Sequence, residues 1–149
     1  MRAFTLNNPA VVFDFQFEEA NRLASKKRSL IRQIMNAYGV NSIATDPFRM
    51  YFSNFKKDGK FDTSFKESCN NLDDLLIVNS EESYLKMFPK EKLVYLSPNA
   101  KYEMKEVDED KVYIIGVLAD EGVYKPYTYD QARLDGIRCE RFPLDRYMK

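Results

Sequence analysis

The stretch KVYIIGVLAD, at residues 111–120, constrains the fold of this chain more than any other segment. It is a near-continuous apolar run, which is typical of a strand buried on both faces of a parallel sheet. Gly116 ends the run, and a glycine there lets a ligand or another backbone approach closely. Ligands of open α/β sheets collect outside the carboxyl ends of the strands. Asp120 follows shortly after, and its carboxylate could accept a proton or orient a nucleophile at such an edge.

A second interpretation of these residues stays open. In it, Gly116 only permits a turn and Asp120 lies in a solvated loop. Spacing alone favours this second interpretation, because aspartate is common in loops.

Apolar runs alternate with helical patterns along the chain. Strands are predicted at residues 10–16, 48–55, 75–78, 93–96, 112–115 and 137–142. Helices are predicted from Phe17 to a stop at Gly39, over residues 61–72, from Ser80 to Pro89, and from a cap at Thr128 or Asp130 to Gly136. This alternation predicts a single α/β domain over residues 1–149, with a mostly parallel six-stranded sheet and helices on both faces.

Composition excludes several classes of function. Lys plus Arg equals Asp plus Glu at 23 each, so no global positive field indicates nucleic acid. The basic run Lys26–Arg28 favours a solvated helix face over an RNA grip. The chain has no histidine, which removes imidazole bases and His-ligated metal sites. No apolar run approaches membrane-spanning length. Cys69 and Cys139 match no metal or redox spacing and are predicted to be reduced core thiols.

Familiar catalytic and binding motifs are missing. There is no GxGxxG and no GxxxxGK[ST], so neither usual phosphate cradle is present. The acidic residues between 106 and 110 lack the spacing of a calcium loop, which favours a solvated connection. Ten tyrosines and eleven phenylalanines could stack on bases, but most lie in strands beside Val, Ile and Leu, so core packing is the better prediction.

Five segments carry a more specific resemblance. In chain order they are FEEANR, DPFRMYFSNFKKDG, MFPKEKLVYLS, DEDKVYIIGVLAD and RFPLDRYM. Their order and spacing resemble the SPOUT-class tRNA N1-purine methyltransferases that modify position 9, over nearly the whole chain from about Ala10. DPFRMYFSNFKKDG and Phe88–Lys90 are most similar to the mitochondrial branch, which is the methyltransferase subunit of mitochondrial ribonuclease P.

The resemblance implies a fold, a cofactor and a set of site residues. It implies a Rossmann-like SPOUT domain that uses S-adenosylmethionine to methylate N1 of guanine or adenine in tRNA. The cofactor would lie in a trefoil-knotted pocket at the carboxyl edge of the sheet, with Asp120 as general base. The implied cofactor-binding residues are Leu96, Ser97, Gly116, Phe142, Pro143 and Leu144.

The residues are compatible with that chemistry. N1 of guanine carries a proton that must leave when the nitrogen attacks a methyl sulfonium. A carboxylate within hydrogen-bond reach can accept this proton without a metal or a histidine. Partial burial at the sheet edge would raise the pKa of that carboxylate toward a useful value.

The resemblance also implies partners and a location. The implied partners are tRNA and the short-chain dehydrogenase and nuclease subunits of mitochondrial ribonuclease P, with no membrane partner. The implied location is the mitochondrion. The alternative function is a non-catalytic subunit that holds tRNA and these partners, and a third is an unrelated Rossmann-like small-molecule binder. The family carries a basic amino-terminal extension and a knot segment after RFPLDRYM. We therefore expect the chain to be a fragment without the carboxyl-terminal knot segment, and to bind cofactor and tRNA weakly or not at all by itself.

Overall fold

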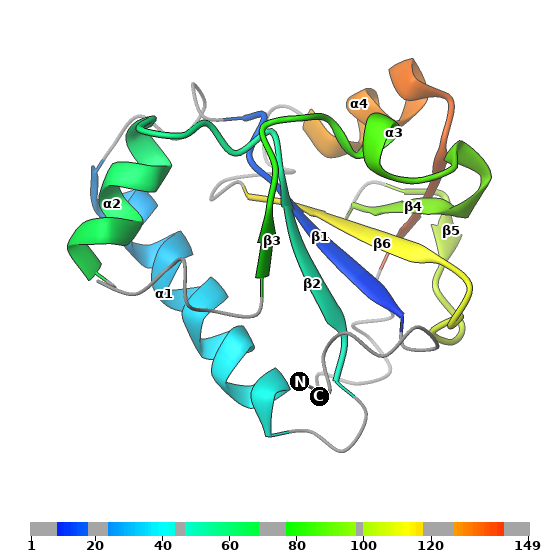
Figure 1. Ribbon diagram of the computed structural model, residues 1–149. Helices are drawn as coiled ribbons and strands as arrows, with labels where there is room; N and C mark the ends of the chain where they lie inside the picture. Colours follow the sequence, from blue (N-terminus) through cyan, green and yellow to red (C-terminus); the bar gives the residue numbers. More distant parts are fainter. Residues whose placement is uncertain are drawn as a thin grey trace.

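The computed structural model describes residues 9–17, 24–43, 47–68, 77–97, 100–117 and 127–141. The described strands form one seven-stranded sheet in the order β3-β2-β1-β6-β4-β7-β5, and all of its pairings are parallel (Figure 1). The strands are β1 (Ala10–Asp14), β2 (Arg49–Ser53), β3 (Ile77–Asn79), β4 (Leu93–Leu96), β5 (Tyr102–Glu103), β6 (Val112–Gly116) and β7 (Arg138–Arg141). The helices are α1 (Ala24–Ser42), α2 (Lys60–Ser68), α3 (Tyr84–Met87) and α4 (Tyr127–Asp135), with a 3₁₀ turn, η4, at Lys90–Lys92.

The predicted α/β class with a parallel sheet is confirmed, but the predicted number of six strands was wrong. The additional strand is β5, which pairs Tyr102 with Glu140 and Glu103 with Arg141 of β7. Its two residues lie in a polar, acidic stretch without strand periodicity. They are extended because β7 offers them backbone partners, and this is information that the local sequence does not carry.

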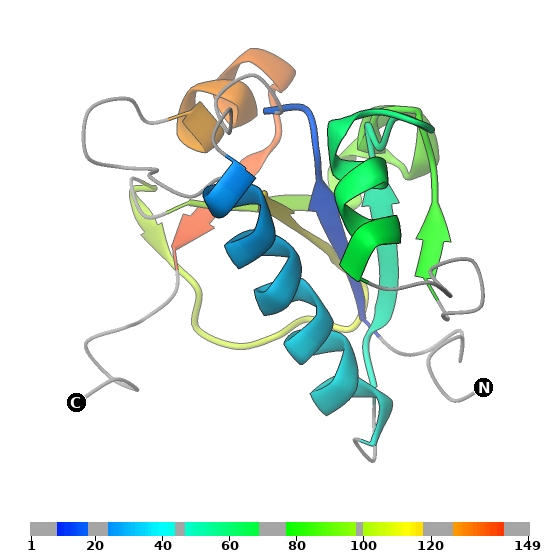
Figure 2. The same cartoon turned by 90° about the vertical axis from the view of Figure 1, so that its left-hand side faces the viewer.

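Helices cover both faces of the sheet. Figure 2 shows α1 and α2 in front of the strands, where they enclose a core of phenylalanines and aliphatic side chains. The ring of Phe15 lies at the centre of this core, 4.8 Å from the rings of Phe52 and Phe55 and 5.1 Å from that of Phe61. On the opposite face, Tyr84 of α3 and Ala132 of α4 belong to a second core. The prediction that these aromatic residues pack in the core is confirmed.

Helix α1 differs from its prediction at both described ends. Phe17 lies in a turn that precedes the helix, so the predicted start at Phe17 was wrong. The helix also continues past Gly39, the predicted stop, because Gly39 is not in the left-handed conformation that ends helices. The helix ends at Ser42 instead. The side chain of Asn41 accepts from the backbone N–H of Phe48 at 2.8 Å and donates to its carbonyl at 2.9 Å.

Two more sequence predictions needed correction. The basic run was predicted to lie on a solvated helix face. Arg28 is exposed, which confirms the prediction for that residue, but Lys27 is only 6% exposed, so the prediction was wrong for Lys27. Cys139 is free, as predicted, but it is half-buried rather than a full core residue, and Cys69 lies outside the described residues.

The ends of α3 and α4 show which local signals were right. Helix α3 is capped by Ser83, whose hydroxyl accepts from the N–H of Leu85 at 3.2 Å; the predicted cap, Ser80, lies in the preceding turn. Thr128 lies inside α4 rather than at its cap. Gly136, with a φ of 66°, ends α4 as predicted. Among the described helices, none combines the length and apolar character that a membrane crossing requires.

Candidate functional site

Strands β1 and β6 lie side by side at the centre of the sheet, and the helices that follow them in the chain pack on opposite faces of the sheet. Helix α1, which follows β1, packs on one face, whereas α4, which follows β6, packs on the other. The two strands are in register from Ala10 and Val112 to Asp14 and Gly116. Adjacent parallel strands with diverging connections leave a crevice at their carboxyl ends, which is where open α/β sheets bind ligands. The carboxyl ends of β1 and β6 are therefore the candidate site.

Three of the predicted site residues meet at this edge. Leu96 ends β4 and pairs with Ile115 of the neighbouring β6, one residue before Gly116. Ser97 follows and is 2% exposed; its backbone N–H donates to the carbonyl of Glu140 at 2.9 Å. The structure thus places Leu96, Ser97 and Gly116 on adjacent strands. The remaining predicted residues, Asp120, Phe142, Pro143 and Leu144, lie outside the described residues.

Gly116 is surrounded closely by side chains. A Cβ atom at this position would lie 2.5 Å from Cγ2 of Thr128, 3.2 Å from the hydroxyl oxygen of Tyr95 and 3.3 Å from Cε2 of Phe17. Its φ is not positive, so a left-handed turn does not explain the glycine. Space excludes a side chain here, because α4 packs directly on the end of β6.

Asp14, one strand away, is a polar residue that the sequence predictions missed. Its side chain is fully buried, at 0% exposure. Among the described residues, four neutral side chains donate to its carboxylate. Oδ1 accepts from the hydroxyl of Ser53 at 3.1 Å and from the amide of Asn54 at 2.7 Å. Oδ2 accepts from the hydroxyl of Tyr95 at 2.7 Å and from the amide of Gln16. The carboxylate therefore ties β1 to β2 and β4 at the edge of the sheet.

Burial raises the pKa of Asp14 above its ordinary value, and the hydrogen bonds from Gln16, Asn54, Tyr95 and Ser53 oppose that rise. Asn54 reaches the carboxylate from a backbone with a φ of 52°, a conformation that costs free energy for a residue with a side chain. Such strain persists only where the surrounding structure compensates for it. Here the compensation includes the 2.7 Å hydrogen bond to Asp14 and a backbone N–H bond to Glu82 at 2.9 Å.

One sequence signal could have identified Asp14. It ends the apolar run AVVFD in the same way that Gly116 and Asp120 follow the run KVYII, so it is also a carboxylate at the end of a buried strand. Its donors could not have been found this way. Ser53 and Tyr95 are 39 and 81 positions away in the sequence, and only the sheet order brings them together.

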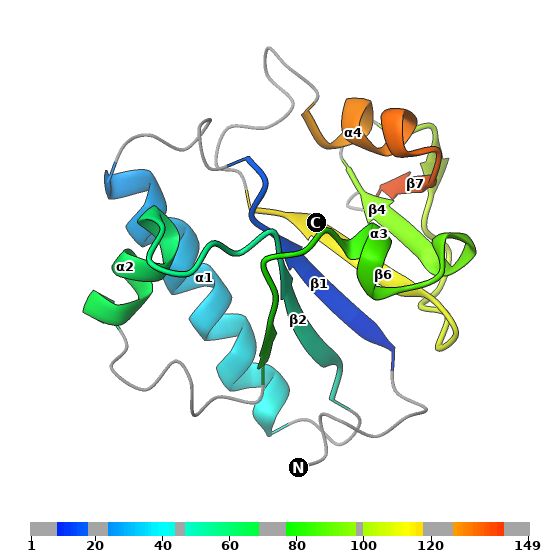
Figure 3. The same ribbon diagram turned by 45° about the horizontal axis from the view of Figure 1, so that its top comes forward.

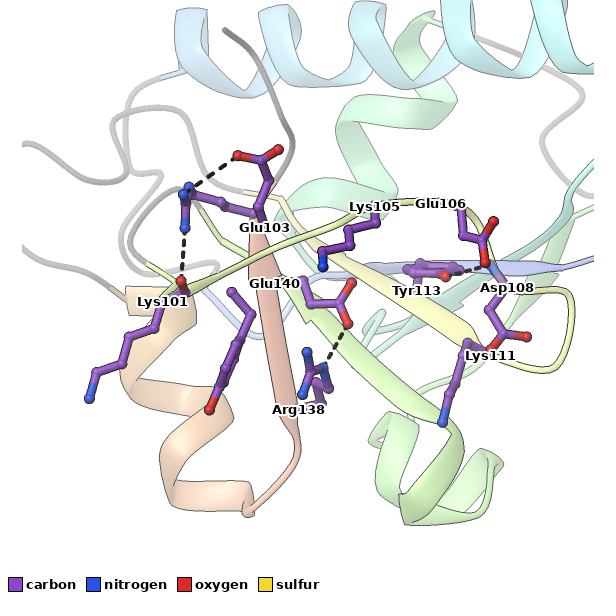
Figure 4. Close-up of a pocket in the computed structure, with 11 residues that line it drawn as sticks. Lys101, Glu103, Lys105, Glu106, Asp108, Lys111, Tyr113, Arg138 and Glu140 are labelled. Atoms are coloured by element: carbon purple, nitrogen blue, oxygen red, sulfur yellow. Dashed lines mark hydrogen bonds and ion pairs between the residues drawn. The ribbon is translucent and has the colours of Figure 1, made fainter. Parts of the chain in front are cut away.

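A cleft of about 540 Å³ lies along β5 and β7 at the far edge of the sheet (Figure 4). Positive and negative side chains alternate around it and several pair with one another. Nε of Arg138 donates to Glu140 at 2.7 Å, and Nη2 of Arg141 lies 3.6 Å from the carboxylate of Glu103. The hydroxyl of Tyr113 accepts from the backbone N–H of Asp108 at 2.7 Å. Several of these charges are already paired with one another, and the cleft lies away from the carboxyl ends of β1 and β6, so it is a poorer candidate than the edge at Gly116.

Within the part of the chain that the structure describes, no group of three or more His, Cys, Asp or Glu side chains could hold a metal ion. In the same part of the chain, no buried polar side-chain atom lacks a hydrogen-bond partner. The candidate site therefore consists of the buried carboxylate of Asp14 with its hydrogen-bond donors, beside the backbone of Gly116 and the small side chain of Ser97.

Comparisons with known proteins agree with this arrangement. A family model described as "tRNA (guanine(9)-N(1))-methyltransferase TRM10/TRM10A" matches residues 2–149. The tRNA methyltransferase 10 homolog B of Danio rerio is 36% identical over 135 residues, which are 88% of this chain and 40% of that protein. The homolog C of Xenopus tropicalis is 32% identical over 140 residues, or 93% of this chain and 31% of that protein. The chain thus spans less than half of the length of these relatives.

Two solved structures are similar to this fold. The crystal structure of full-length spTrm10 in complex with SAH has a TM-score of 0.86 and 30% identity, covering 94% of this chain and 78% of that one. The structure of a dual specific Trm10 from Thermococcus kodakaraensis has a TM-score of 0.66 over 90% of this chain and 76% of that one; at 20% identity it supports the fold alone. The predicted Rossmann-like SPOUT fold is confirmed by the Trm10 structures. From the family match and these relatives, the chain belongs to the TRM10 family of tRNA (guanine(9)-N(1))-methyltransferases.

Proposed function

We propose that this protein transfers the methyl group of S-adenosylmethionine to N1 of guanine 9 in tRNA. The observation that carries the proposal is the similarity to the spTrm10 complex with SAH, at a TM-score of 0.86 over 94% of this chain. SAH, S-adenosylhomocysteine, is the product left when S-adenosylmethionine has given up its methyl group. The name of the matching family supports guanine 9 and its N1 atom as the acceptor.

The residues at the edge fit such a cofactor. S-adenosylmethionine has no phosphate, so it needs neither a glycine-rich phosphate loop nor a basic cradle, and the chain has no such loop motif. The carboxyl ends of β4 and β6 offer the buried Ser97 and the side-chain-free Gly116 on adjacent strands. Leu96, Ser97 and Gly116 would line the pocket together with Phe142, Pro143 and Leu144.

The bound cofactor supplies an electrophilic methyl group on a positively charged sulfur. The bond between this methyl group and sulfur breaks as the bond to N1 of guanine forms, which leaves a neutral thioether. The N1 proton passes to the carboxylate of Asp120, the proposed general base. Asp14 has a different role: at 0% exposure it organises the edge and does not reach the substrate. Most of the rate enhancement would come from holding the nitrogen, methyl and sulfur atoms in line.

Methyl transfer by the full-length protein tests this proposal. Labelled S-adenosylmethionine is incubated with a tRNA transcript that has guanine at position 9 and with one that has uridine there. We expect label only on the guanine transcript, and we expect Asp120→Asn to reduce the rate by about 10²–10⁴-fold while tRNA binding is kept. Asp110→Asn, at an exposed position, is the matched control and retains activity. An unchanged rate for Asp120→Asn removes Asp120 from its role, and equal labelling of both transcripts rejects N1 of guanine 9.

We also propose that the protein acts in the mitochondrion, with the dehydrogenase and nuclease subunits of mitochondrial ribonuclease P. The support is the resemblance of DPFRMYFSNFKKDG and Phe88–Lys90 to the mitochondrial branch. Purification of the full-length protein from fractionated cells, followed by mass spectrometry, is the test. Recovery in the mitochondrial fraction with both subunits is expected. Recovery from other fractions without them rejects this assignment and leaves the methyltransferase proposal unaffected.

A further inference from the structure

A hydrogen bond links helix α3 to helix α4 on the face of the sheet opposite α1 and α2. The hydroxyl of Tyr84 on α3 donates to a carboxylate oxygen of Asp135, the last residue of α4. The side chain of Tyr84 is fully buried. The amide of Gln131, one turn back along α4, donates to both oxygens of Asp135, at 3.1 and 3.2 Å. The acceptor is thus held in a fixed orientation toward Tyr84, and α3 and α4 lie on the same side of the molecule (Figure 3).

From Tyr84 the contacts continue to the edge of the sheet. The ring of Tyr84 packs edge-on against that of Tyr95, with centroids 5.7 Å apart. The hydroxyl of Tyr95 donates to Asp14 at 2.7 Å. The amide of Gln16 donates to Asp14 and lies 3.5 Å from the hydroxyl of Tyr84. These two tyrosines, packed edge-on, therefore each donate to a carboxylate, one on α4 and one at the candidate site.

The other end of α4 contacts the candidate site directly. Thr128, in the first turn of the helix, is fully buried, and its Cγ2 occupies the space where a side chain of Gly116 would lie. The helix has nine residues, and an isolated helix of that length is marginal in water. Its position therefore depends on tertiary contacts: the fully buried Ala132 in the second core, Thr128 on Gly116 at one end, and Asp135 on Tyr84 at the other.

We propose that Tyr84 and Asp135 are positioning residues for the cofactor site, because their hydrogen bond fixes α4 and so keeps Thr128 packed on Gly116. The inference rests on the proposed function, since it needs the cofactor to bind at this edge. Neither side chain contacts the reacting atoms. They act through α4, whose displacement by a fraction of an ångström would change the packing on Gly116 at the proposed cofactor site, and catalytic geometry is sensitive to shifts on that scale.

Three variants of the full-length protein test the proposal: Tyr84→Phe, Asp135→Ala and the double variant. Tyr84→Phe keeps the ring that packs on Tyr95 and removes the hydroxyl, with its hydrogen bond to Asp135 and its 3.5 Å contact with the amide of Gln16, so we expect the fold to be retained. Asp135→Ala removes the bond to Tyr84 and leaves the contact with Gln16 in place. Tyr113→Phe is the matched control, because its hydroxyl bonds the backbone of Asp108 in the cleft of Figure 4, away from α4. The two readouts are amide hydrogen exchange over residues 127–135 and the affinity for S-adenosylhomocysteine by calorimetry.

We expect Tyr84→Phe to speed exchange in α4 and to weaken S-adenosylhomocysteine binding by about fivefold, the lower end of couplings between distinct sites. Asp135→Ala should have a similar effect, and the double variant should be no worse than either single one. Tyr113→Phe should change neither readout. Faster exchange in α4 with unchanged affinity for S-adenosylhomocysteine makes the bond merely structural and overturns the proposal. Unchanged exchange in α4 overturns it too, and so do losses of affinity that add up in the double variant.

If the unsubstituted protein binds no S-adenosylhomocysteine, the proposed function fails, and the dependent positioning role fails with it. Exchange then reports only whether the hydrogen bond holds α4.

Discussion

The close contact between α4 and the end of β6 makes Gly116→Ala an informative substitution. The new Cβ would lie 2.5 Å from Cγ2 of Thr128, which is closer than van der Waals contact allows. Thr128 is fully buried, so its methyl group has no free volume to move into without shifting α4. Overpacking of this kind costs about 1–3 kcal/mol. We expect a loss of about 2 kcal/mol, which lowers the melting temperature by about 4–8 °C for a chain of this size.

The clash also predicts that a second substitution, Thr128→Ser, partly restores the stability lost in Gly116→Ala. Thr128→Ser removes the methyl group that Cβ would meet and keeps the hydroxyl. Alone it should cost about 1 kcal/mol, because a buried methyl group is lost. Combined with Gly116→Ala, the two methyl groups exchange places, and the double variant should be more stable than Gly116→Ala by about 1 kcal/mol. The two changes are then strongly non-additive.

Gly39→Ala is the matched control for the same chemical change. Gly39 lies inside α1, and nothing lies within 4 Å of a Cβ built there. Alanine should therefore stabilise the protein by about 0.5–1 kcal/mol through helix propensity. Urea unfolding followed by circular dichroism measures all four variants. If Gly116→Ala is as stable as the parent, or if Thr128→Ser adds its own loss to that of Gly116→Ala, the packing of α4 on β6 is not as described.

Further predictions concern the carboxylate of Asp14 and its donors. Burial raises its pKa above the unfolded value of 3.8, so Asp14 contributes stability at low pH that is lost as the pH rises through the folded-state pKa. The stability of the parent relative to Asp14→Asn should therefore fall as the pH rises above about 4 in urea titrations, and a constant difference contradicts this. Tyr95→Phe removes a donor to the buried carboxylate and should cost about 1.5–3 kcal/mol by thermal unfolding; a neutral effect would show that the bond is unimportant. Asn54→Gly and Asp58→Gly both relieve a positive φ, but only the first loses a hydrogen bond to Asp14, so it should be the less stable by about 1–2 kcal/mol. Equal stabilities of these two glycine variants would contradict that role.

The positions of the central strands along the chain could be predicted from the sequence because their residues carry the signal themselves. Leu93–Leu96 is a continuous apolar run, and the observed β4 has the predicted bounds. Ile77–Asn79 and Val112–Gly116 lie within a residue or two of their predictions for the same reason. Tyr102–Glu103 could not be found, since its extended form comes from pairing with β7 rather than from its own composition.

The candidate site was predictable only in part. The rule that ligands gather at the carboxyl ends of parallel strands identified Gly116, and the family resemblance added Leu96 and Ser97. The structure brings these residues to neighbouring strand ends, and their contact with the cofactor stays a prediction. The same rule applied to AVVFD would have identified Asp14. It would not have shown that Tyr95 and Asn54 donate hydrogen bonds to this carboxylate. Those contacts depend on the strand order β2-β1-β6-β4, which a single sequence does not specify.

A crystal structure of the full-length protein with S-adenosylhomocysteine tests the central claim most directly. We predict that the ligand lies at the carboxyl ends of β4 and β6, in contact with the backbone around Ser97 and Gly116, with the carboxylate of Asp120 facing the position of the departed methyl group. A ligand bound in the cleft along β5 and β7, or an Asp120 that points away from the sulfur atom, would contradict the proposed site and mechanism.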